Sequence, residues 1–264
     1  MLAKLNLYFF IPTGIPLITT FFIKFNGLRL NPVDYIKYLG MYIDKFLNWN
    51  QHIHELCKKL SRAIGVLSKL RYNVTLPICL QVYYAIFFSH MTNGCNLWGF
   101  TSEENILKIE RLQKKCVRIL SFAPFNSHTN QLFIDLNLIK VRDLISINRL
   151  KLVYDFLNNR LPDDLTSLFR LSSDVHTTSR ELNSSINKLI YIPRFKTITY
   201  GKDSLRYQCA KLWNTIFKTG EIQINTDKSK NIKLAKIKTI NMFKQAIKKY
   251  YLYSYTVVPD RIYY

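Results

Sequence analysis

The spacing of apolar residues separates an extended N-terminal part of the chain from a helical remainder. β-Branched and aromatic residues alternate through residues 19–27, "TTFFIKFNG", up to an Asn-Gly turn, and the extended pattern resumes in residues 36–44, "IKYLGMYID". From Gln51 the apolar residues recur at steps of three and four, which is typical of an amphipathic helix. This apolar stripe consists of Ile53, Leu56, Leu60, Ile64, Leu67 and Leu70. We therefore expect an α+β protein in which short N-terminal β-hairpins precede a mainly helical bundle.

Further helices are predicted after the first one. Residues 76–91 are apolar on most sides, so we expect a buried helix there, with Pro77 in its first turn. Residues 102–122 have one apolar face and two glutamates in the first turn, where they suit the helix dipole. The helical pattern continues in residues 130–159, whereas residues 171–187 are rich in Ser and Thr, as in a surface loop.

One uncharged stretch, residues 5–23, is nearly as long as a membrane span. Pro12, Gly14 and Pro16 interrupt it in the middle. Two strands joined by a Pro-Gly turn fit this pattern better than a membrane helix does, and there is no small-residue cleavage site of the signal-peptide kind. We therefore expect a buried β-hairpin here and no membrane partner.

The charge of the chain favours a polyanionic partner. The 264 residues include 38 Lys and Arg against 17 Asp and Glu, which gives a net charge of +21. From this balance, nucleic acid is expected before an anionic membrane. Basic residues also cluster outside the apolar faces of the first and third predicted helices. These residues are Lys58, Lys59, Arg62, Lys69, Arg71, Lys108, Arg111, Lys114, Lys115 and Arg118. Two such faces favour a phosphate-binding surface over ordinary solvated helix faces.

The most basic part of the chain lies near its C-terminus. Residues 188–249 contain 15 Lys and Arg against three Asp and Glu. Aromatic residues are interleaved with them: Tyr191, Phe195, Tyr200, Tyr207, Trp213, Phe217 and Phe243. Aromatic and basic residues together suit single-stranded nucleic acid, whose bases stack while its phosphates pair with cations. They suit equally well a small core with a charged exterior, and both interpretations are open.

Cysteine and histidine do not form a metal-binding pattern. The five cysteines are dispersed without a C-x-x-C pair, so we expect reduced, mostly buried thiols rather than a zinc site or a disulfide framework. They are Cys57, Cys79, Cys95, Cys116 and Cys209. His52 and His54 would diverge on a helix. His128 and His176 lie in polar loops, where we expect surface or capping roles.

Adjacent aspartates at positions 163 and 164 raise the question of a catalytic metal site. Such a pair can hold Mg²⁺ in a two-metal polymerase. A polymerase pair, however, belongs in a hairpin between apolar strands, whereas "LPDDL" lies between helical patterns and after Pro162. We expect Pro162 to end one element and an aspartate to cap the next helix.

A family resemblance begins at residues 36–53, "IKYLGMYIDKFLNWNQHI". This segment resembles the part of non-LTR (LINE-type, Jockey-like) retrotransposon reverse transcriptases that leaves the palm through the primer grip and enters the thumb. The resemblance continues in the same order through "LSRAIGVLSKLR", "YYAIFFSHMTNGCNLWG", "IERLQKKCVRIL", "HTNQLFIDLNLIKVRDL", "RLPDDLTSLF" and "IPRFKTITYGKDSLRYQCAKLWNTI". It covers nearly the whole chain, roughly residues 1–255.

The resemblance implies three parts in the chain. Residues 1–50 would form the palm edge with the primer-grip hairpin, residues 51–123 the helical thumb, and residues 124–264 a helical and then basic C-terminal region. In this family the thumb helices close over the duplex of template and primer. The fold implied in this way agrees with the α+β pattern predicted from the residues.

The resemblance also implies roles for particular residues. In this family a strand-turn-strand corner supports the 3′ end of the primer, and here that corner consists of Tyr38, Leu39 and Gly40. Gly40 would let the backbone approach the nucleic acid or adopt a positive φ, although a plain hairpin glycine is the alternative. Lys4 in "AKLNLYFF" is a candidate for the family's nucleotide-side lysine.

The resemblance implies that the catalytic domains and motifs of these polymerases lie outside this sequence. The endonuclease, the fingers and the palm motifs with the catalytic aspartates would all lie N-terminal to Met1, and Asp34 and Asp44 in the grip region do not replace them. Without two metal-binding carboxylates a primer hydroxyl cannot be activated. We therefore expect no catalytic residue, metal site or cofactor in this chain, and no DNA synthesis by it alone. Mg²⁺ is expected only for the full-length polymerase.

The expected activity is sequence-tolerant binding of RNA, DNA or an RNA-DNA hybrid. Besides the grip corner, the expected contacts are Lys58, Lys59, Arg62, Lys114, Lys115 and Arg118. The N-terminal part of the polymerase is a further expected partner, and we expect a ribonucleoprotein in the nucleus and cytoplasm, not a secreted protein. Two alternatives are open. The chain belongs to an active polymerase that extends beyond Met1, or it is a remnant or co-opted interaction module without selected nucleic-acid binding.

Overall fold

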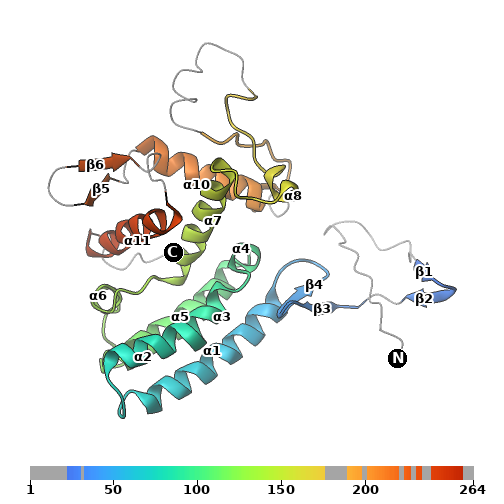
Figure 1. Cartoon of the computed structure of the whole chain (residues 1–264). Coiled ribbons are helices and arrows are strands. Elements are labelled where there is room, and N and C mark those ends of the chain that lie inside the picture. Colours follow the sequence, from blue (N-terminus) through green and yellow to red (C-terminus); the bar gives the residue numbers. More distant parts are fainter. Residues whose placement is uncertain are drawn as a thin grey trace. The chain divides into compact units, whose positions relative to one another are not determined.

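The computed structural model shows an α+β chain of short antiparallel hairpins and helices, as predicted (Figure 1). It describes residues 23–30, 33–175, 189–197, 201–219, 223–226, 230–233 and 239–257. Lys4, His176, Tyr200 and nearly all of the hairpin predicted for residues 5–23 lie outside these ranges. No helix among the described residues is long and apolar enough to cross a membrane.

The chain divides into two compact units, and each is described by itself. The first comprises residues 1–94 and 98–112, and the second comprises residues 95–97 and 113–264. The predicted boundaries at residues 50 and 123 separate functional parts of a polymerase, not compact units. They therefore differ from this division and stay a prediction.

The elements follow one another in this order. The first unit contains β1 (Ile23–Phe25), β2 (Leu28–Leu30), β3 (Tyr35–Tyr38), β4 (Met41–Asp44), α1 (Asn50–Leu70), α2 (Leu76–Val82), the π-helix η1 (Tyr83–Phe88) and α3 (Ser89–Thr92). Two helices are shared between the units: α4 (Cys95–Trp98) and α5 (Glu103–Leu120). The second unit continues with α6 (Asn130–Asp135), α7 (Val141–Leu157), α8 (Asp163–Thr166), α10 (Leu205–Thr219), β5 (Gln223–Thr226), β6 (Lys230–Lys233) and α11 (Ile240–Val257).

The β3–β4 hairpin has a tight two-residue turn. The strands pair antiparallel, with Tyr35 opposite Asp44 and Tyr38 opposite Met41. Leu39 and Gly40 form the turn with φ of 47° and 82°, so both lie in the left-handed region. Hairpin turns of this kind require positive φ at both central residues, which glycine adopts without steric cost. The positive φ predicted for Gly40 is confirmed.

The loop between β4 and α1 is folded around one carboxylate. Asp44 accepts hydrogen bonds from the backbone N–H groups of Phe46 (3.1 Å), Asn48 (3.1 Å) and Trp49 (2.7 Å). Trp49 precedes α1 with φ of 66° and is buried. The carboxylate thus directs the chain from the hairpin straight into the helix, because it satisfies donors that the turn leaves without backbone partners.

The apolar stripe predicted for the first helix is confirmed almost completely. The residues of α1 that lie in the core include Ile53, Leu56, Leu60, Ile64 and Leu67. Leu70, at the end of the helix, is half-buried. His52 is buried and His54 exposed, so the two imidazoles diverge as expected. The helical period therefore identifies which side of α1 faces the core of the first unit.

The second predicted helix exists, but the expectation that it is buried on most sides is wrong. It consists of α2, η1 and α3 in direct succession. Tyr83, Phe87 and Met91 are completely buried, whereas Ile78 and Tyr84 are 45% and 40% exposed. A helix at the edge of a bundle buries a single stripe even where its other sides are apolar, since only one side meets other helices.

The second unit has its own core, between α7, α10 and α11. Tyr154 stacks on Phe243 with ring centroids 4.2 Å apart, and Trp213 lies beside the same ring at 6.2 Å. All three are buried. Trp213 and Phe243 belong to the aromatic residues for which two interpretations were open, and for these two the core interpretation is confirmed.

Buried amides connect segments of the second unit. The side chain of Gln113 donates to the carbonyl of Ile139 (2.8 Å) and accepts from the N–H of Val141 (2.9 Å), at the start of α7. Asn214 on α10 does the same for Ile190, donating to its carbonyl (2.7 Å) and accepting from its N–H (3.0 Å). Each amide satisfies one donor and one acceptor of a loop backbone that would otherwise be buried without partners.

The aspartate pair begins a helix, but neither aspartate caps it. The helix α8 starts at Asp163, and Pro162 occupies the cap position, with its carbonyl accepting from Leu165 and Thr166 at 3.0 Å each. No side chain makes a capping hydrogen bond there. The predicted aspartate cap is therefore wrong. Both aspartates are exposed in the first turn.

The cysteines are free thiols, as predicted. Cys79, Cys95, Cys116 and Cys209 are buried and Cys57 is half-buried. Burial raises the pKa of Cys95 to about 11 and that of Cys116 and Cys209 to about 12, so these thiols stay protonated at neutral pH. Among the described residues no group of three or more His, Cys, Asp or Glu is placed to hold a metal ion.

Candidate nucleic-acid interface

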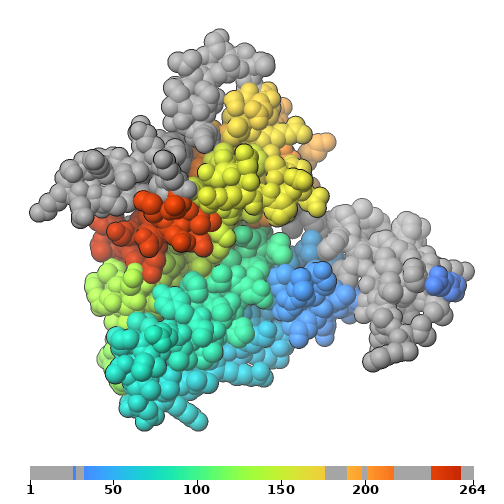
Figure 2. Space-filling view, viewed as in Figure 1, coloured from blue at the N-terminus to red at the C-terminus, as the bar shows by residue number. Residues whose placement is uncertain are grey.

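The β3–β4 hairpin is anchored at its base and exposed at its tip. Tyr38 and Leu39 at the tip are 59% and 76% exposed. At the base, Asp44 holds the loop that leads into α1, and nearer the tip the N–H of Tyr42 donates to Nδ1 of His52 on α1 (3.4 Å). Figure 2 shows the hairpin residues (blue) directly against the residues of the helical bundle (cyan). The sequence thus presents an aromatic and an aliphatic side chain to solvent from a fixed support.

A glycine next to the hairpin makes this close packing possible. Gly94 has φ of 62°, and a Cβ atom at this position would lie 2.1 Å from Sδ of Met41 in β4. A larger residue at this position would be strained by the positive φ and would force the side chain of Met41 to move. Gly40 itself is less restricted, since a Cβ there would meet only Nδ2 of Asn93 at an ordinary 3.7 Å.

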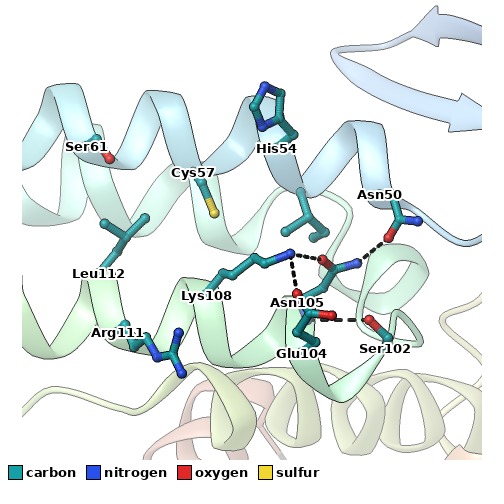
Figure 3. Close-up of a pocket in the computed structure, with 11 residues that line it drawn as sticks. Asn50, His54, Cys57, Ser61, Ser102, Glu104, Asn105, Lys108, Arg111 and Leu112 are labelled. Atoms are coloured by element: carbon teal, nitrogen blue, oxygen red, sulfur yellow. Dashed lines mark hydrogen bonds and ion pairs between the residues drawn. The ribbon is translucent and has the colours of Figure 1, made fainter.

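A groove of about 610 Å³ lies between α1 and α5 in the first unit (Figure 3). Its lining consists of Asn50, Ile53, His54, Cys57, Ser61, Ser102, Glu104, Asn105, Lys108, Arg111 and Leu112. Most of these side chains are amides, hydroxyls or charged groups, and Cys57 and Lys108 point into the space between the helices. These groups offer hydrogen-bond donors to a ligand with acceptor oxygens, and apolar atoms, among them those of Ile53 and Leu112, form much of the remaining lining.

Hydrogen bonds between side chains fix one end of the groove. Nδ2 of Asn105 donates to Oδ1 of Asn50 (2.7 Å) and to Oγ1 of Thr101 (2.8 Å). The hydroxyl of Thr101 donates in turn to the carbonyl of Asn48 (2.9 Å). This network, centred on the buried Asn105, connects the starts of α1 and α5.

The charged groups of the groove have a positive balance. Nζ of Lys108 lies 2.9 Å from Oε1 of Glu104 and 3.3 Å from Oδ1 of Asn105. The hydrogen bond from Lys108 lowers the pKa of Glu104, so this carboxylate is charged at neutral pH. Lys108 and Arg111 leave a net positive charge beside it. Since the ion pair is exposed, it contributes little to stability.

The three basic residues predicted on α1 lie beside the groove rather than in it. Lys58 and Arg62 are exposed, and Lys58 pairs with Glu55 at 2.8 Å. They follow His54 at four-residue steps and therefore continue the exposed side of α1 next to the groove. Lys59 is half-buried, and its charge adds to the burial that lowers the pKa of His52.

The three basic residues predicted on α5 belong to the second unit. Along the helix, Lys115 and Arg118 continue the row of Lys108 and Arg111 at seven-residue spacing, whereas Lys114 lies to one side. Lys115 is exposed and Lys114 half-buried. Arg118 is partly used within its own unit, because its Nε donates to the carbonyl of Ser127 (3.0 Å).

Several groove residues are not among the contacts predicted from the sequence. They are Asn50, His54, Ser61, Ser102, Asn105, Lys108 and Arg111. The sequence places Lys108 and Arg111 only on a basic helix face, and their seven-residue spacing to Lys115 and Arg118 is the signal that links them. The polar residues carried no signal of their own, because the groove exists only once α1 and α5 pair.

The fold and this surface together define a basic, mainly helical module with a β-hairpin fixed at its edge. No family model and no solved structure matches the chain. It is similar to the RNA-directed DNA polymerase from mobile element jockey of Drosophila melanogaster, with 26% identity over 124 residues. The probable RNA-directed DNA polymerases from transposon X-element and from transposon BS of the same organism are 26% and 27% identical over 113 and 127 residues.

These similarities confirm the resemblance to Jockey-like retrotransposon reverse transcriptases. They cover 42% of this chain for the X-element protein, 46% for jockey and 47% for BS. The chain spans only a small share of those relatives: 12% of the X-element protein and 14% of each of the other two.

Proposed function

We propose that this chain is the part of a retrotransposon RNA-directed DNA polymerase that binds the nucleic acid of template and primer. The similarity to transposon polymerases supports the class of partner. The groove between α1 and α5 is the observation that carries the proposal, because its amide and hydroxyl donors and the cations in and beside it suit a sugar-phosphate backbone. RNA, DNA and their hybrid all present this backbone.

In this proposal the residues of the groove and the basic residues beside it have complementary roles. Arg111 and Arg62 supply guanidinium groups that can hold a phosphate through two parallel hydrogen bonds. Asn50, Ser61 and Ser102 supply neutral donors for sugar and phosphate oxygens. The remaining proposed contacts add favourable charge. They are Lys58, Lys59, Lys114, Lys115 and Arg118. Binding of this type depends on phosphates and therefore tolerates any base sequence.

The hairpin tip is proposed to support the end of the primer. Leu39 is an exposed, non-glycine residue in the left-handed region, which costs about 1–2 kcal/mol. The fold itself gives no reason for a leucine here, since asparagine is favoured at this turn position. An exposed leucine at this strained position fits a contact with a partner, and Tyr38 beside it offers a ring for stacking.

The proposal assigns binding rather than nucleotide addition to the described residues. Both oxygens of Asp44 are occupied by backbone N–H groups. Asp34 forms an exposed ion pair with Lys45 (2.8 Å). Asp163 and Asp164 lie in the four-residue helix α8. The carboxylates that would hold Mg²⁺ during DNA synthesis are proposed to lie in other parts of the polymerase.

Binding of a fluorescein-labelled RNA-DNA hybrid to the full chain, followed by anisotropy, tests the proposal. In the test variant Arg62, Lys108 and Arg111 are replaced by Gln. In a control variant with the same loss of charge, Lys151, Lys244 and Lys249 on α7 and α11 are replaced by Gln. We expect the test variant to bind at least about tenfold more weakly than the control at moderate salt. Equal affinities of the two variants would contradict the proposed surface.

The variant Leu39→Asn tests the hairpin tip separately. Asparagine relieves the strain of the turn, so we expect the free energy of unfolding to rise by about 0.5–1 kcal/mol. Affinity for a hybrid with a recessed primer end should fall at the same time, as measured by anisotropy. A variant that gains stability and keeps full affinity would show that Leu39 does not contact the primer.

A further inference from the structure

We propose that the second unit carries a separate site for an unpaired nucleic-acid strand, formed by Arg194, Phe195 and Lys196 together with Lys202 and Tyr207. This site rests on the proposed function in that its ligand is again nucleic acid, but it uses none of the residues of the groove. Phe195 would stack on a base, and the cations around it would contact the neighbouring phosphates. A segment without regular secondary structure, residues 191–197, presents it.

The aromatic residue is exposed and yet held in place. Phe195 is 44% exposed, and its ring meets that of Tyr207 edge to face, with centroids 5.0 Å apart and an angle of 81° between the planes. Gly201 supports it from another direction, because a Cβ atom at this position would lie 2.6 Å from Cβ of Phe195. A ring that is fixed before binding loses little conformational freedom when a base stacks on it.

The segment before Phe195 is fixed to the unit from two directions. The N–H of Tyr191 donates to the carbonyl of Arg170 (2.9 Å), and the N–H of Ser172 donates to the carbonyl of Leu189 (2.9 Å). On the other side, Asn214 of α10 makes its two hydrogen bonds with Ile190. The chain therefore leaves the core at a defined point, directly before the exposed residues.

The start of α10 is also held by hydrogen bonds. The hydroxyl of Ser204 accepts from the N–H of Tyr207 (3.3 Å), and it donates to the carbonyl of Gly201 (2.6 Å). Nε2 of Gln208 donates to the carbonyl of Lys202 (2.9 Å). These bonds fix the backbone of Tyr207 and Lys202, the two residues of this turn that belong to the site.

The charges around Phe195 identify nucleic acid as the ligand. Arg194, Lys196 and Lys202 are exposed, and the nearby acid, Asp203, is half-buried and close enough to Arg149 to interact with it electrostatically. An aromatic ring between cations matches the way in which single strands are bound, with bases on rings and phosphates on cations. In a duplex the bases are stacked on each other and do not offer a free face, so the site selects an unpaired strand.

Phe195→Leu and Phe195→Trp in the full chain test this site, with Tyr253→Leu as the control. Leucine keeps an apolar contact with Tyr207 but cannot stack, whereas tryptophan stacks at least as well. Tyr253 is an exposed aromatic residue on α11, outside the site. The probes are a labelled oligo(U) strand and a labelled RNA-DNA hybrid, both followed by anisotropy, and thermal unfolding shows that each variant is folded.

We expect Phe195→Leu to bind oligo(U) about 5- to 150-fold more weakly, which corresponds to the loss of one stacked base. Phe195→Trp and Tyr253→Leu should bind like the unmodified chain, and the hybrid should be bound about equally by all variants. Unchanged binding of oligo(U) by Phe195→Leu, or an equal loss for both probes, would overturn the site. If the unmodified chain binds the hybrid but not oligo(U), the site is wrong while the proposed function stands. If it binds neither, both fail.

Discussion

At the scale of single residues, Asp44 connects two elements of the proposed interface. Its carboxylate accepts three backbone hydrogen bonds and so joins the hairpin to α1. A charged acceptor of this kind is worth more than a neutral one, and its loss leaves the buried N–H of Trp49 without a partner. The β3–β4 hairpin and α1 are therefore coupled through one side chain.

We predict that Asp44→Ala lowers the free energy of unfolding by about 2–3 kcal/mol, because three donors lose their acceptor together. The loss of unfolding free energy in Asp44→Asn should be smaller than in Asp44→Ala, since the amide still provides one acceptor oxygen. Urea unfolding followed by circular dichroism measures both. As a control, Asp34→Ala removes an exposed ion pair of the same hairpin and should leave the midpoint unchanged. Equal effects at both positions would show that Asp44 is only a surface residue.

His52 makes the stability of the first unit depend on pH. The side chain is 5% exposed, it lies between Trp49 and Trp98, and its Nε2 has no hydrogen-bond partner. Burial, and to a smaller extent Lys59, lowers the pKa of His52 to about 4. In the unfolded chain a histidine has a pKa of about 6.5, so the unfolded state takes up the proton first as the pH falls.

The contribution of neutral His52 to stability is thus complete above pH 6.5 and is lost as the pH falls from 6.5 to about 4. The slope reaches at most about 1.4 kcal/mol per pH unit. We predict that His52→Gln flattens the pH dependence of urea unfolding in this window, whereas His54→Gln, on the exposed side of the same helix, does not. An unchanged slope in His52→Gln would contradict the burial of a neutral imidazole.

At the scale of elements, two glycines of the first unit have opposite roles. Gly65 lies in the middle of α1, and a Cβ there would meet no atom within 4 Å. Gly94 has a positive φ, and a Cβ there would run into Met41. A glycine within a helix weakens it, whereas a glycine with positive φ at a close contact is required by the fold.

We predict that Gly65→Ala raises the free energy of unfolding by about 0.5–1 kcal/mol and that Gly94→Ala lowers it by about 1–3 kcal/mol. Adding Met41→Ala to Gly94→Ala should recover part of the loss, because the flexible side chain that blocks the new methyl group is removed. Denaturant unfolding of the single and double variants measures this. A change of the same sign at both glycines would contradict the packing of the hairpin on the end of α3.

The helices also show which structural features a sequence pattern can predict and which it cannot. The period of Ile53, Leu56 and Leu60 predicted both α1 and its buried side, because a helix with a single apolar stripe has one way to face a core. The helix from Leu76 to Thr92 is apolar on several sides, so its period could not identify the stripe that is buried. Its π-helical stretch carried no sequence signal either.

At the scale of the whole molecule, the class of partner could be predicted from the net charge, but the surfaces that would bind it could not. The excess of Lys and Arg indicated a polyanionic partner, but the groove depends on the pairing of α1 with α5, which no periodicity within one helix reveals. The same limit applies to the C-terminal aromatics. Trp213 and Phe243 are in the core and Phe195 is exposed, although all three stand among basic residues in the sequence.

The salt dependence of binding tests the central claim most directly. Each phosphate neutralised by a cation contributes about 0.9 to the slope of log affinity against log salt concentration. We predict that the affinity of the full chain for an RNA-DNA hybrid falls at least about tenfold between about 50 and 200 mM salt, and that the Arg62, Lys108 and Arg111 to Gln variant has a shallower slope. A flat response of the unmodified chain over this range would contradict nucleic-acid binding through its basic surface.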